Sequence, residues 1–124
     1  MKKLLVVMGL CVSAALAFAH TGPETLKIDA AAKKQPAVPF PHGKHSKTMK
    51  CDTCHHTNKG LTAEKATAET KIAKCSACHL DPKGDVPSMR EMSMTKNPFH
   101  LRCISCHKEQ KKGPTGVCTG CHKK

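Results

Sequence analysis

The sequence has no tryptophan, no tyrosine and only three phenylalanines among its 124 residues. Beyond the first 19 residues it is also short of apolar side chains, since residues 20–124 hold only 12 leucine, isoleucine, valine and phenylalanine residues. A highly charged chain with less than about 20% of these residues is expected to be disordered. An ordinary side-chain core is therefore excluded, and something else must provide the interior. The lack of aromatic residues also argues against nucleic acid as a partner, because single strands stack on aromatic side chains.

Long apolar runs are absent except at the start of the chain. In residues 1–19, Lys2 and Lys3 precede an apolar run that ends in Ala17-Phe18-Ala19. This order is typical of a cleaved signal peptide. The alternative is a membrane anchor, but the run is short for a span, so we expect no stable membrane insertion. Cleavage would discard Cys11 with the signal and leave residues 20–124 as one exported domain.

Eight cysteines remain in residues 20–124, and they fall into four C-x-x-C-H motifs. This is the attachment pattern of c-type haem. Two thiols three positions apart lie on one side of a helical turn, where both can reach one porphyrin, and the next residue places an imidazole under the iron. The motifs are Cys51-Asp52-Thr53-Cys54-His55, Cys75-Ser76-Ala77-Cys78-His79, Cys103-Ile104-Ser105-Cys106-His107 and Cys118-Thr119-Gly120-Cys121-His122.

Two other uses of paired cysteines are zinc sites and disulfides in an exported protein. Neither explains why a histidine follows the second cysteine in all four motifs. The sequence therefore predicts four covalently attached haem c groups.

Five histidines lie outside the motifs: His20, His42, His45, His56 and His100. Four haems with two axial histidines each need four of them, and His20 is the spare because it would be the first, frayed residue after cleavage. His56 cannot share an iron with His55, because adjacent side chains on a helix point about 100° apart. It must therefore reach another haem. His42 and His45 project from one side of a turn, so their irons must lie close together.

The motifs and the segment LKIDAAAKKQPAVPFPHGKHSKTMKCDTCHH resemble the class III multihaem cytochromes, chiefly the tetrahaem cytochrome c3 family. The tail CISCHKEQKKGPTGVCTGCHKK is similar to the trihaem cytochromes c7, which lack the second haem. The resemblance implies a small cytochrome c3-like fold, mostly irregular and helical with a short two-stranded hairpin, wrapped around four haems. It also implies that His42 serves the first haem, His56 the second, His45 the third and His100 the fourth.

The chain departs from cytochrome c3 in three places. All four motifs have two residues between the cysteines, His100 stands only three residues before Cys103, and the interval from His55 to Cys75 is long. A thioether is an alternative axial ligand near His100. The candidates are Met89, Met92 and Met94. We favour His100 as the ligand and the methionines as packing against a porphyrin edge.

Local patterns predict a few short elements. Leu26 and Ile28 alternate with polar residues and are expected to pair with residues 37–40, with flanking prolines confining that strand to an edge. Residues 62–74 are expected to form a surface helix capped by Thr62, and residues 88–96 another that Pro98 would stop. Gly113-Pro114 predicts a turn between the last two motifs.

Eight histidines on four irons leave no open axial position, which favours outer-sphere electron transfer over catalysis at iron. By resemblance, we expect a monomeric periplasmic electron carrier, not an enzyme, between a donor such as hydrogenase or a membrane cytochrome and a terminal reductase. Residues 20–124 have a net charge of +10, which suggests steering toward acidic partners. The basic residues beside the motifs are Lys44, Lys47, Lys50, Lys108, Lys111, Lys112, Lys123 and Lys124.

Reduction of a haem is also expected to raise the pKa of nearby propionates, so that electron uptake draws in protons. Two alternatives of other classes are a multihaem metal-ion reductase and a subunit of an extracellular haem filament, in which His20 would be the donor to a neighbouring subunit.

Overall fold

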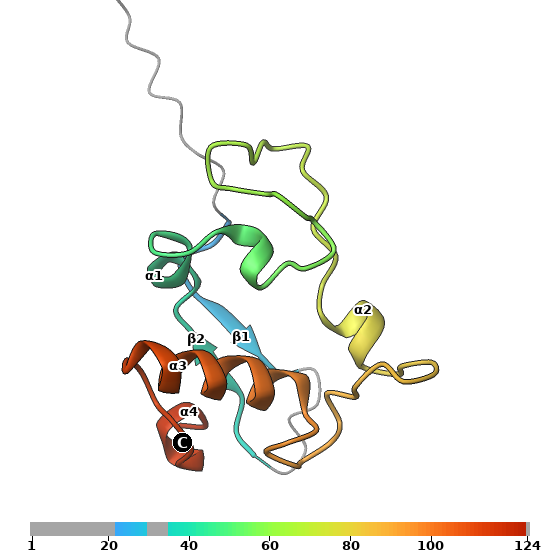
Figure 1. Ribbon diagram of the computed structural model, residues 1–124, viewed down its shortest axis with the longest axis vertical. Helices are drawn as coiled ribbons and strands as arrows, with labels where there is room; N and C mark the ends of the chain where they lie inside the picture. Colours follow the sequence, from blue (N-terminus) through green and yellow to red (C-terminus); the bar gives the residue numbers. More distant parts are fainter. Residues whose placement is uncertain (1–21, 30–34, 124) are drawn as a thin grey trace, which may run out of the picture.

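The computed structural model describes residues 22–29 and 35–123 of the chain (Figure 1). The predicted signal peptide, its cleavage site, His20 and Lys124 lie outside the described residues. Within the described residues, no helix has the length and apolar character needed to cross a membrane. The elements are short and are joined by long irregular segments, as predicted. In chain order they are β1 (Leu26–Ile28), β2 (Val38–Phe40), α1 (His42–Ser46), the 3₁₀ turn η1 (Cys51–Thr53), α2 (Ser76–His79), the π-helical turn η2 (His100–Ile104), α3 (Ser105–Gln110) and α4 (Cys118–Cys121).

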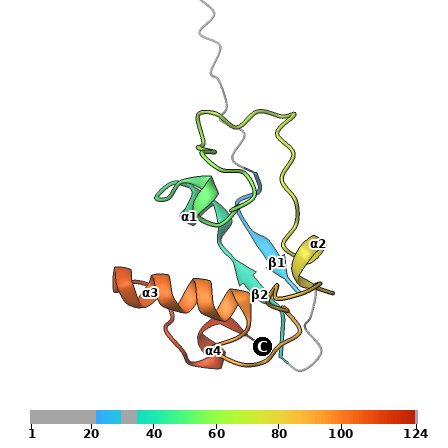
Figure 2. The same cartoon turned by 45° about the vertical axis from the view of Figure 1, so that its right-hand side comes forward.

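The predicted hairpin is confirmed. β1 and β2 pair antiparallel, with Leu26 opposite Phe40 and Ile28 opposite Val38. Pro39, which has no N–H to donate, sits in the middle of β2, and a two-stranded sheet tolerates it because each strand has a free edge. In both ribbon views the hairpin runs from the α1 end of the molecule toward α3 and α4 (Figures 1 and 2).

The helix expected over residues 62–74 is wrong. This segment contains only turns, in which Lys65 and Ala66 both donate a backbone N–H to the carbonyl of Thr62. The hydroxyl of Thr70 then accepts the backbone N–H of Thr67 at 2.8 Å, which gives the backbone a local alternative to helical bonds. A helix of this length is marginal without an apolar face to pack, and the segment has none.

The helix expected over residues 88–96 is also wrong, and Pro98 begins a helix instead of ending one. Residues 88–96 form turns, and helical structure starts at Pro98 and continues through η2 into α3. Asn97 caps this helix, because its Oδ1 accepts the backbone N–H of Phe99 at 2.8 Å and of His100 at 3.3 Å. Proline fits the first helical position well, since its missing N–H would have no partner there.

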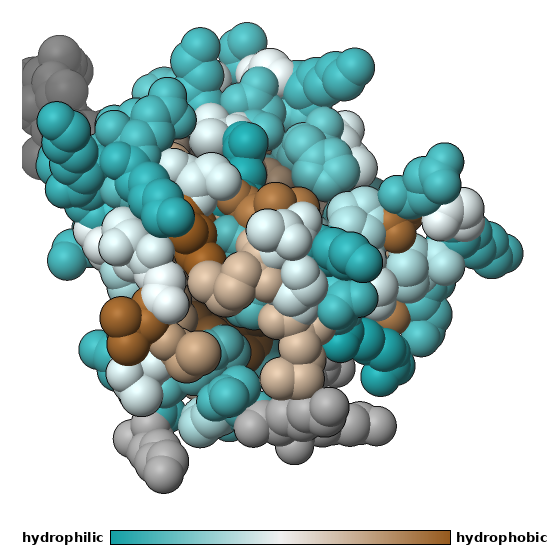
Figure 3. All heavy atoms as spheres, turned by 60° about the horizontal axis from the view of Figure 1, so that its bottom comes forward, coloured by the Kyte–Doolittle hydropathy of each residue, from teal (hydrophilic) through white to brown (hydrophobic). Residues whose placement is uncertain are grey.

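The described residues contain almost no side-chain core. Among the hydrophobic residues only Met89 is buried, at 5% exposure, and among the polar ones only Asn97, at 7%. The remaining apolar side chains are half-buried or exposed, and Figure 3 shows several of them around recesses in one face of the molecule. This arrangement agrees with the sequence prediction that side chains do not supply the interior.

Candidate haem-binding sites

Each C-x-x-C-H motif folds as about one helical turn. In three of the four motifs the histidine donates its backbone N–H to the carbonyl of the first cysteine, at 2.8–2.9 Å: His55 to Cys51, His79 to Cys75 and His122 to Cys118. The third motif lies within the continuous helix of η2 and α3. One turn carries both thiols to the same side, which is the geometry that attachment of a porphyrin at two points requires.

The motif cysteines are free thiols. None of the eight takes part in a disulfide, and the described residues contain no group of three or more His, Cys, Asp or Glu side chains placed to hold a metal ion. Burial, followed by the charges of Cys54 and Cys121, raises the pKa of the Cys103 thiol to about 11. In the described part of the chain the two thiols of every motif are therefore free, as attachment to a porphyrin requires.

The eight histidines of the described residues form four facing pairs. Each pair joins one motif histidine to one histidine from outside the motifs, and the ring centres are 5.9–6.4 Å apart. The pairs are His42 with His55 (6.2 Å), His56 with His79 (5.9 Å), His45 with His107 (6.2 Å) and His100 with His122 (6.4 Å).

This separation fits an iron held between the two rings. A metal–imidazole bond is about 2 Å long and the nitrogen lies about 1 Å from the ring centre, so two rings on opposite sides of one metal have centres about 6 Å apart. Each pair also stands beside its own pair of cysteines, because one of its rings belongs to the motif. The residues present therefore fit a haem that is bound through two thiols and two imidazoles.

Backbone carbonyls hold most of these rings in one tautomer. In six of the eight histidines, Nδ1 lies 2.7–3.1 Å from a backbone carbonyl oxygen and donates to it, which leaves Nε2 free to bind a metal. The partners are Pro23 for His42, Pro41 for His45, Pro87 for His79, Ser93 for His100, Pro114 for His107 and Pro36 for His122. All six carbonyls come from residues outside the motif helices and α1, so the irregular segments orient the rings.

The adjacent histidines His55 and His56 serve different pairs, since His55 faces His42 and His56 faces His79. Burial, followed by the charges of His42 and His56, lowers the pKa of His55. The lowered pKa favours the neutral imidazole, which is the form that binds a metal.

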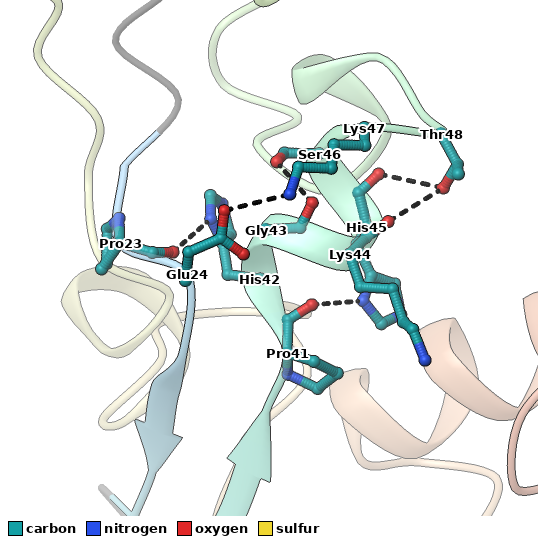
Figure 4. A network of polar contacts seen from close by, with 10 residues as sticks. All are labelled: Pro23, Glu24, Pro41, His42, Gly43, Lys44, His45, Ser46, Lys47 and Thr48. Carbon is teal, nitrogen blue, oxygen red and sulfur yellow. Dashed lines mark hydrogen bonds and ion pairs between the residues drawn. The ribbon is translucent and has the colours of Figure 1, made fainter.

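Helix α1 presents two of the non-motif rings (Figure 4). His42 lies beside β1 through its bond to Pro23, and the backbone N–H of Gly43 donates to the carbonyl of Glu24 at 2.9 Å. The ring of Phe40 packs against His45 with centres 4.6 Å apart. The hairpin thus fixes α1, and α1 carries His42 to one motif and His45 to another.

The ring that pairs with the motif histidine His122 is that of His100. Met89 is buried, whereas Met92 is 50% exposed and Met94 43% exposed. His100 faces His122, and its Nδ1 is held by Ser93.

Two residues beside the motifs, Asn97 and Arg102, were missed by the sequence analysis, and Gly113 was predicted only as part of a turn. Asn97 joins several backbone groups near His100, Gly113 approaches the ring of His107, and the guanidinium of Arg102 contacts the carbonyl of Thr53 in the first motif. The dipeptide Asn97-Pro98 is a recognisable helix-start signal. Nothing in the sequence marks Arg102, because its contact spans 49 residues.

The predicted basic surface is exposed. All seven of its lysines that the structure describes are solvent-accessible, and Lys47 makes an ion pair with Glu24 at 3.2 Å. The others are Lys44, Lys50, Lys108, Lys111, Lys112 and Lys123.

Comparison with known proteins gives two kinds of match. The model of the class III cytochrome c family matches residues 17–124. Cytochrome c3 of Desulfovibrio desulfuricans is 37% identical over 103 residues, which cover 80% of this chain and 91% of that protein. The nine-haem cytochrome c of Desulfovibrio desulfuricans (strain ATCC 27774 / DSM 6949 / MB) is 29% identical over 86 residues, 68% of this chain but only 26% of that longer protein.

Proposed function

Because the chain belongs to the class III cytochrome c family, we propose that it is a multihaem electron carrier with four covalently bound haem c groups, each with two axial histidines. The observation that carries the proposal is the set of four facing histidine pairs at 5.9–6.4 Å, each beside one pair of cysteines. The thioether positions are Cys51 and Cys54, Cys75 and Cys78, Cys103 and Cys106, and Cys118 and Cys121.

We assign the axial ligands by these pairs. Each haem takes the histidine of its own motif and the ring that faces it. The pairs are His55 and His42 for the first haem, His79 and His56 for the second, His107 and His45 for the third, and His122 and His100 for the fourth.

Each bound haem supplies an iron that accepts and releases one electron. The two imidazoles of each histidine pair would occupy both axial positions of an iron, which would leave no open position for a small substrate. Carbonyl-bonded Nδ1 atoms make the ligands more basic and favour a low potential. Histidine in place of methionine has the same effect. This chemistry supports a low-potential carrier and not an enzyme.

The proposed location is the periplasm. Residues 1–19 would direct the export of the chain and would then be removed. The proposed partners are redox proteins with acidic surfaces, such as hydrogenase or a membrane cytochrome, which the exposed lysines would attract. We propose coupled proton uptake as well. The axial histidines must stay neutral, so the proton is expected on carboxylates near the irons, haem propionates included. At least one potential should then fall as pH rises from about 5 to 9, and flat potentials would refute the coupling.

The central test is an intact mass of the mature protein together with its electron paramagnetic resonance spectrum. A mass of residues 20–124 plus four haems, and a spectrum with only low-spin ferric iron, are expected. Fewer haems, or a high-spin signal in the wild type, would contradict the proposal.

A variant tests the ligand assignment. His56→Ala should convert one haem to high spin and leave the haem on Cys51 and Cys54 unchanged, because His56 faces His79 and not His55. Thr57→Ala, an exposed neighbour, is the matched control and should keep four low-spin haems. An unchanged spectrum in His56→Ala would remove His56 from the ligand set.

A further inference from the structure

Asn97 is the only buried polar residue among those the structure describes, and all of its amide bonds are to backbone. Its Nδ2 donates to the carbonyl of Met89 at 3.0 Å and to that of Glu91 at 2.7 Å. Its Oδ1 accepts the N–H groups of Phe99 and His100. A helix cap needs only the two bonds that Oδ1 accepts, so the two bonds that Nδ2 donates need a separate explanation.

The donated bonds lie in the middle of a segment, residues 87–93, that touches two different histidine pairs. At one end the carbonyl of Pro87 accepts the bond from Nδ1 of His79 at 2.8 Å. At the other end the carbonyl of Ser93 accepts the bond from Nδ1 of His100 at 3.1 Å. In Figure 1 this segment belongs to the yellow-to-orange trace that links α2 to the helix containing α3.

Further bonds tie the same segment to both histidines. The backbone N–H of Met89 donates to the carbonyl of His79 at 2.8 Å, and Met89 is the one buried hydrophobic residue of the described chain. The backbone N–H of Asn97 donates at 3.1 Å to the carbonyl of Ser93, the same oxygen that holds the His100 ring. Asn97 therefore clamps residues 87–93 at two carbonyls between the two that orient the rings.

We infer that Asn97 is a positioning residue that sets the orientation of two axial histidines, His79 of the second haem and His100 of the fourth, through residues 87–93. The inference rests on the proposed bis-histidine ligation. A change at Asn97 would therefore affect the ligands of both haems, although their motifs lie in α2 and α4.

The sign of the effect follows from the ring bonds. An Nδ1–H donated to a carbonyl makes an imidazole a more basic ligand, which stabilises ferric iron. Releasing the clamp weakens the bonds at Pro87 and Ser93, so the second and fourth haem potentials should rise. The rings of the first and third pairs bond to Pro23, Pro41 and Pro114, which lie outside this segment, so their potentials should stay unchanged.

The test uses Asn97→Asp in the haem-loaded protein. Aspartate has the same shape and caps a helix as well as asparagine, so the bonds from Phe99 and His100 remain. It cannot donate to Met89 and Glu91, so the clamp is lost. The carboxylate also adds a negative charge, which by itself would lower nearby potentials, so an upward shift can arise only from the loss of the donated bonds. We expect upward shifts of two potentials in a redox titration, and changed haem-methyl resonances for the second and fourth haems only.

The matched control is Asn58→Asp, at the other asparagine of the sequence. Asn58 likewise donates Nδ2 to a backbone carbonyl, that of Lys71 at 3.1 Å, but no histidine ring bonds to that carbonyl among the described residues. It adds the same negative charge without removing a bond from residues 87–93, so no potential should rise.

Three outcomes overturn the inference. If no potential rises in Asn97→Asp while potentials do rise in Asn97→Ala, which adds no charge, Asn97 is only a helix cap. If Asn97→Asp shifts all four haems equally, its effect is general electrostatics or loosened packing. If both variants match the wild type, Asn97 has no influence on the ligands. Loss of the proposed function itself would be seen separately, as a wild-type protein without four low-spin haems.

Discussion

Gly113 shows how a single residue limits a ligand. It has a φ of +80°, and a Cβ built on it would lie 2.8 Å from Nε2 of His107. The next residue, Pro114, accepts the bond from Nδ1 of the same ring. Glycine is therefore needed both for the left-handed backbone and for the space that the imidazole occupies.

Gly113→Ala should lower stability and disturb the third haem. The left-handed conformation costs a side-chain-bearing residue roughly 1–2 kcal/mol, and the added methyl displaces the His107 ring as well. Gly60→Ala is the matched control, because Gly60 has a φ of +73° and a Cβ added to it would have no atom within 4 Å. Thermal denaturation should show a loss in both variants, and only Gly113→Ala should alter the low-spin signal of one haem. Identical behaviour of the two variants would mean that the ring contact has no effect.

Among the elements, η2 and η1 are joined by one side chain. The guanidinium of Arg102, which directly precedes the third motif, bonds to the carbonyl of Thr53 in the first motif. Burial raises the pKa of the Cys54 thiol, and the charge and hydrogen bond of Arg102 act in the opposite direction. A positive charge thus lies beside an attachment point of the first haem.

Arg102→Gln should lower the potential of the first haem, because a nearby positive charge favours the ferrous state. The effect should be about 1 kcal/mol or less, since Arg102 is exposed and screened by solvent. Arg102→Lys keeps the positive charge but loses the planar contact, so the potential of the first haem should stay close to the wild-type value. Arg90→Gln is the control for the first haem alone, because Arg90 pairs with Asp81 beyond the second motif, and it should leave the first-haem potential unchanged. A redox titration in which Arg102→Gln equals or exceeds the wild-type potential would contradict this assignment.

At the scale of the whole molecule, the described residues have histidine ring pairs where other small proteins have packed side chains. One face of the molecule has recesses lined by apolar residues (Figure 3). Burial of apolar side chains is the usual source of stability, and one buried methionine among the described residues cannot offset the entropy of ordering the chain. The bound haems must therefore supply the missing interior.

Protein produced without haem attachment should be unfolded. Its far-ultraviolet circular dichroism should lack the helical signal of η2 and α3, and its amides should exchange rapidly with solvent. A matched sample from cells with a haem-attachment system serves as control. A cooperatively folded haem-free protein would refute the dependence.

The basic surface should govern encounter with partners. Lys108→Glu with Lys112→Glu, both exposed and close to the third motif, should slow electron transfer from an acidic donor at low salt. The difference should shrink as salt rises, because exposed charges are screened over about 8–10 Å at physiological ionic strength. Lys59→Glu with Lys65→Glu changes the net charge equally between the first two motifs and should leave the rate near wild type. Equal slowing by both pairs would indicate net charge and not a docking surface.

The sequence was informative where the physics is local. The spacing of two cysteines and a histidine is read from five consecutive residues, and alternation around Leu26 and Ile28 predicted a hairpin that the structure contains. The helices expected over residues 62–74 and 88–96 are wrong because local helix propensity does not by itself fix the backbone. Helix propensity is weak, and without an apolar face to bury, side-chain bonds from Thr70 and Asn97 decided the backbone.

The sequence alone predicts that haem c forms the interior of this protein, because it holds four complete attachment motifs and too few apolar residues for an ordinary core. Only the tertiary structure decided which carbonyls orient six of the eight rings and how far apart the paired rings lie. His122, for example, is held by Pro36, 86 residues away. Such contacts depend on how the chain returns past itself, and no spacing within a motif carries that information.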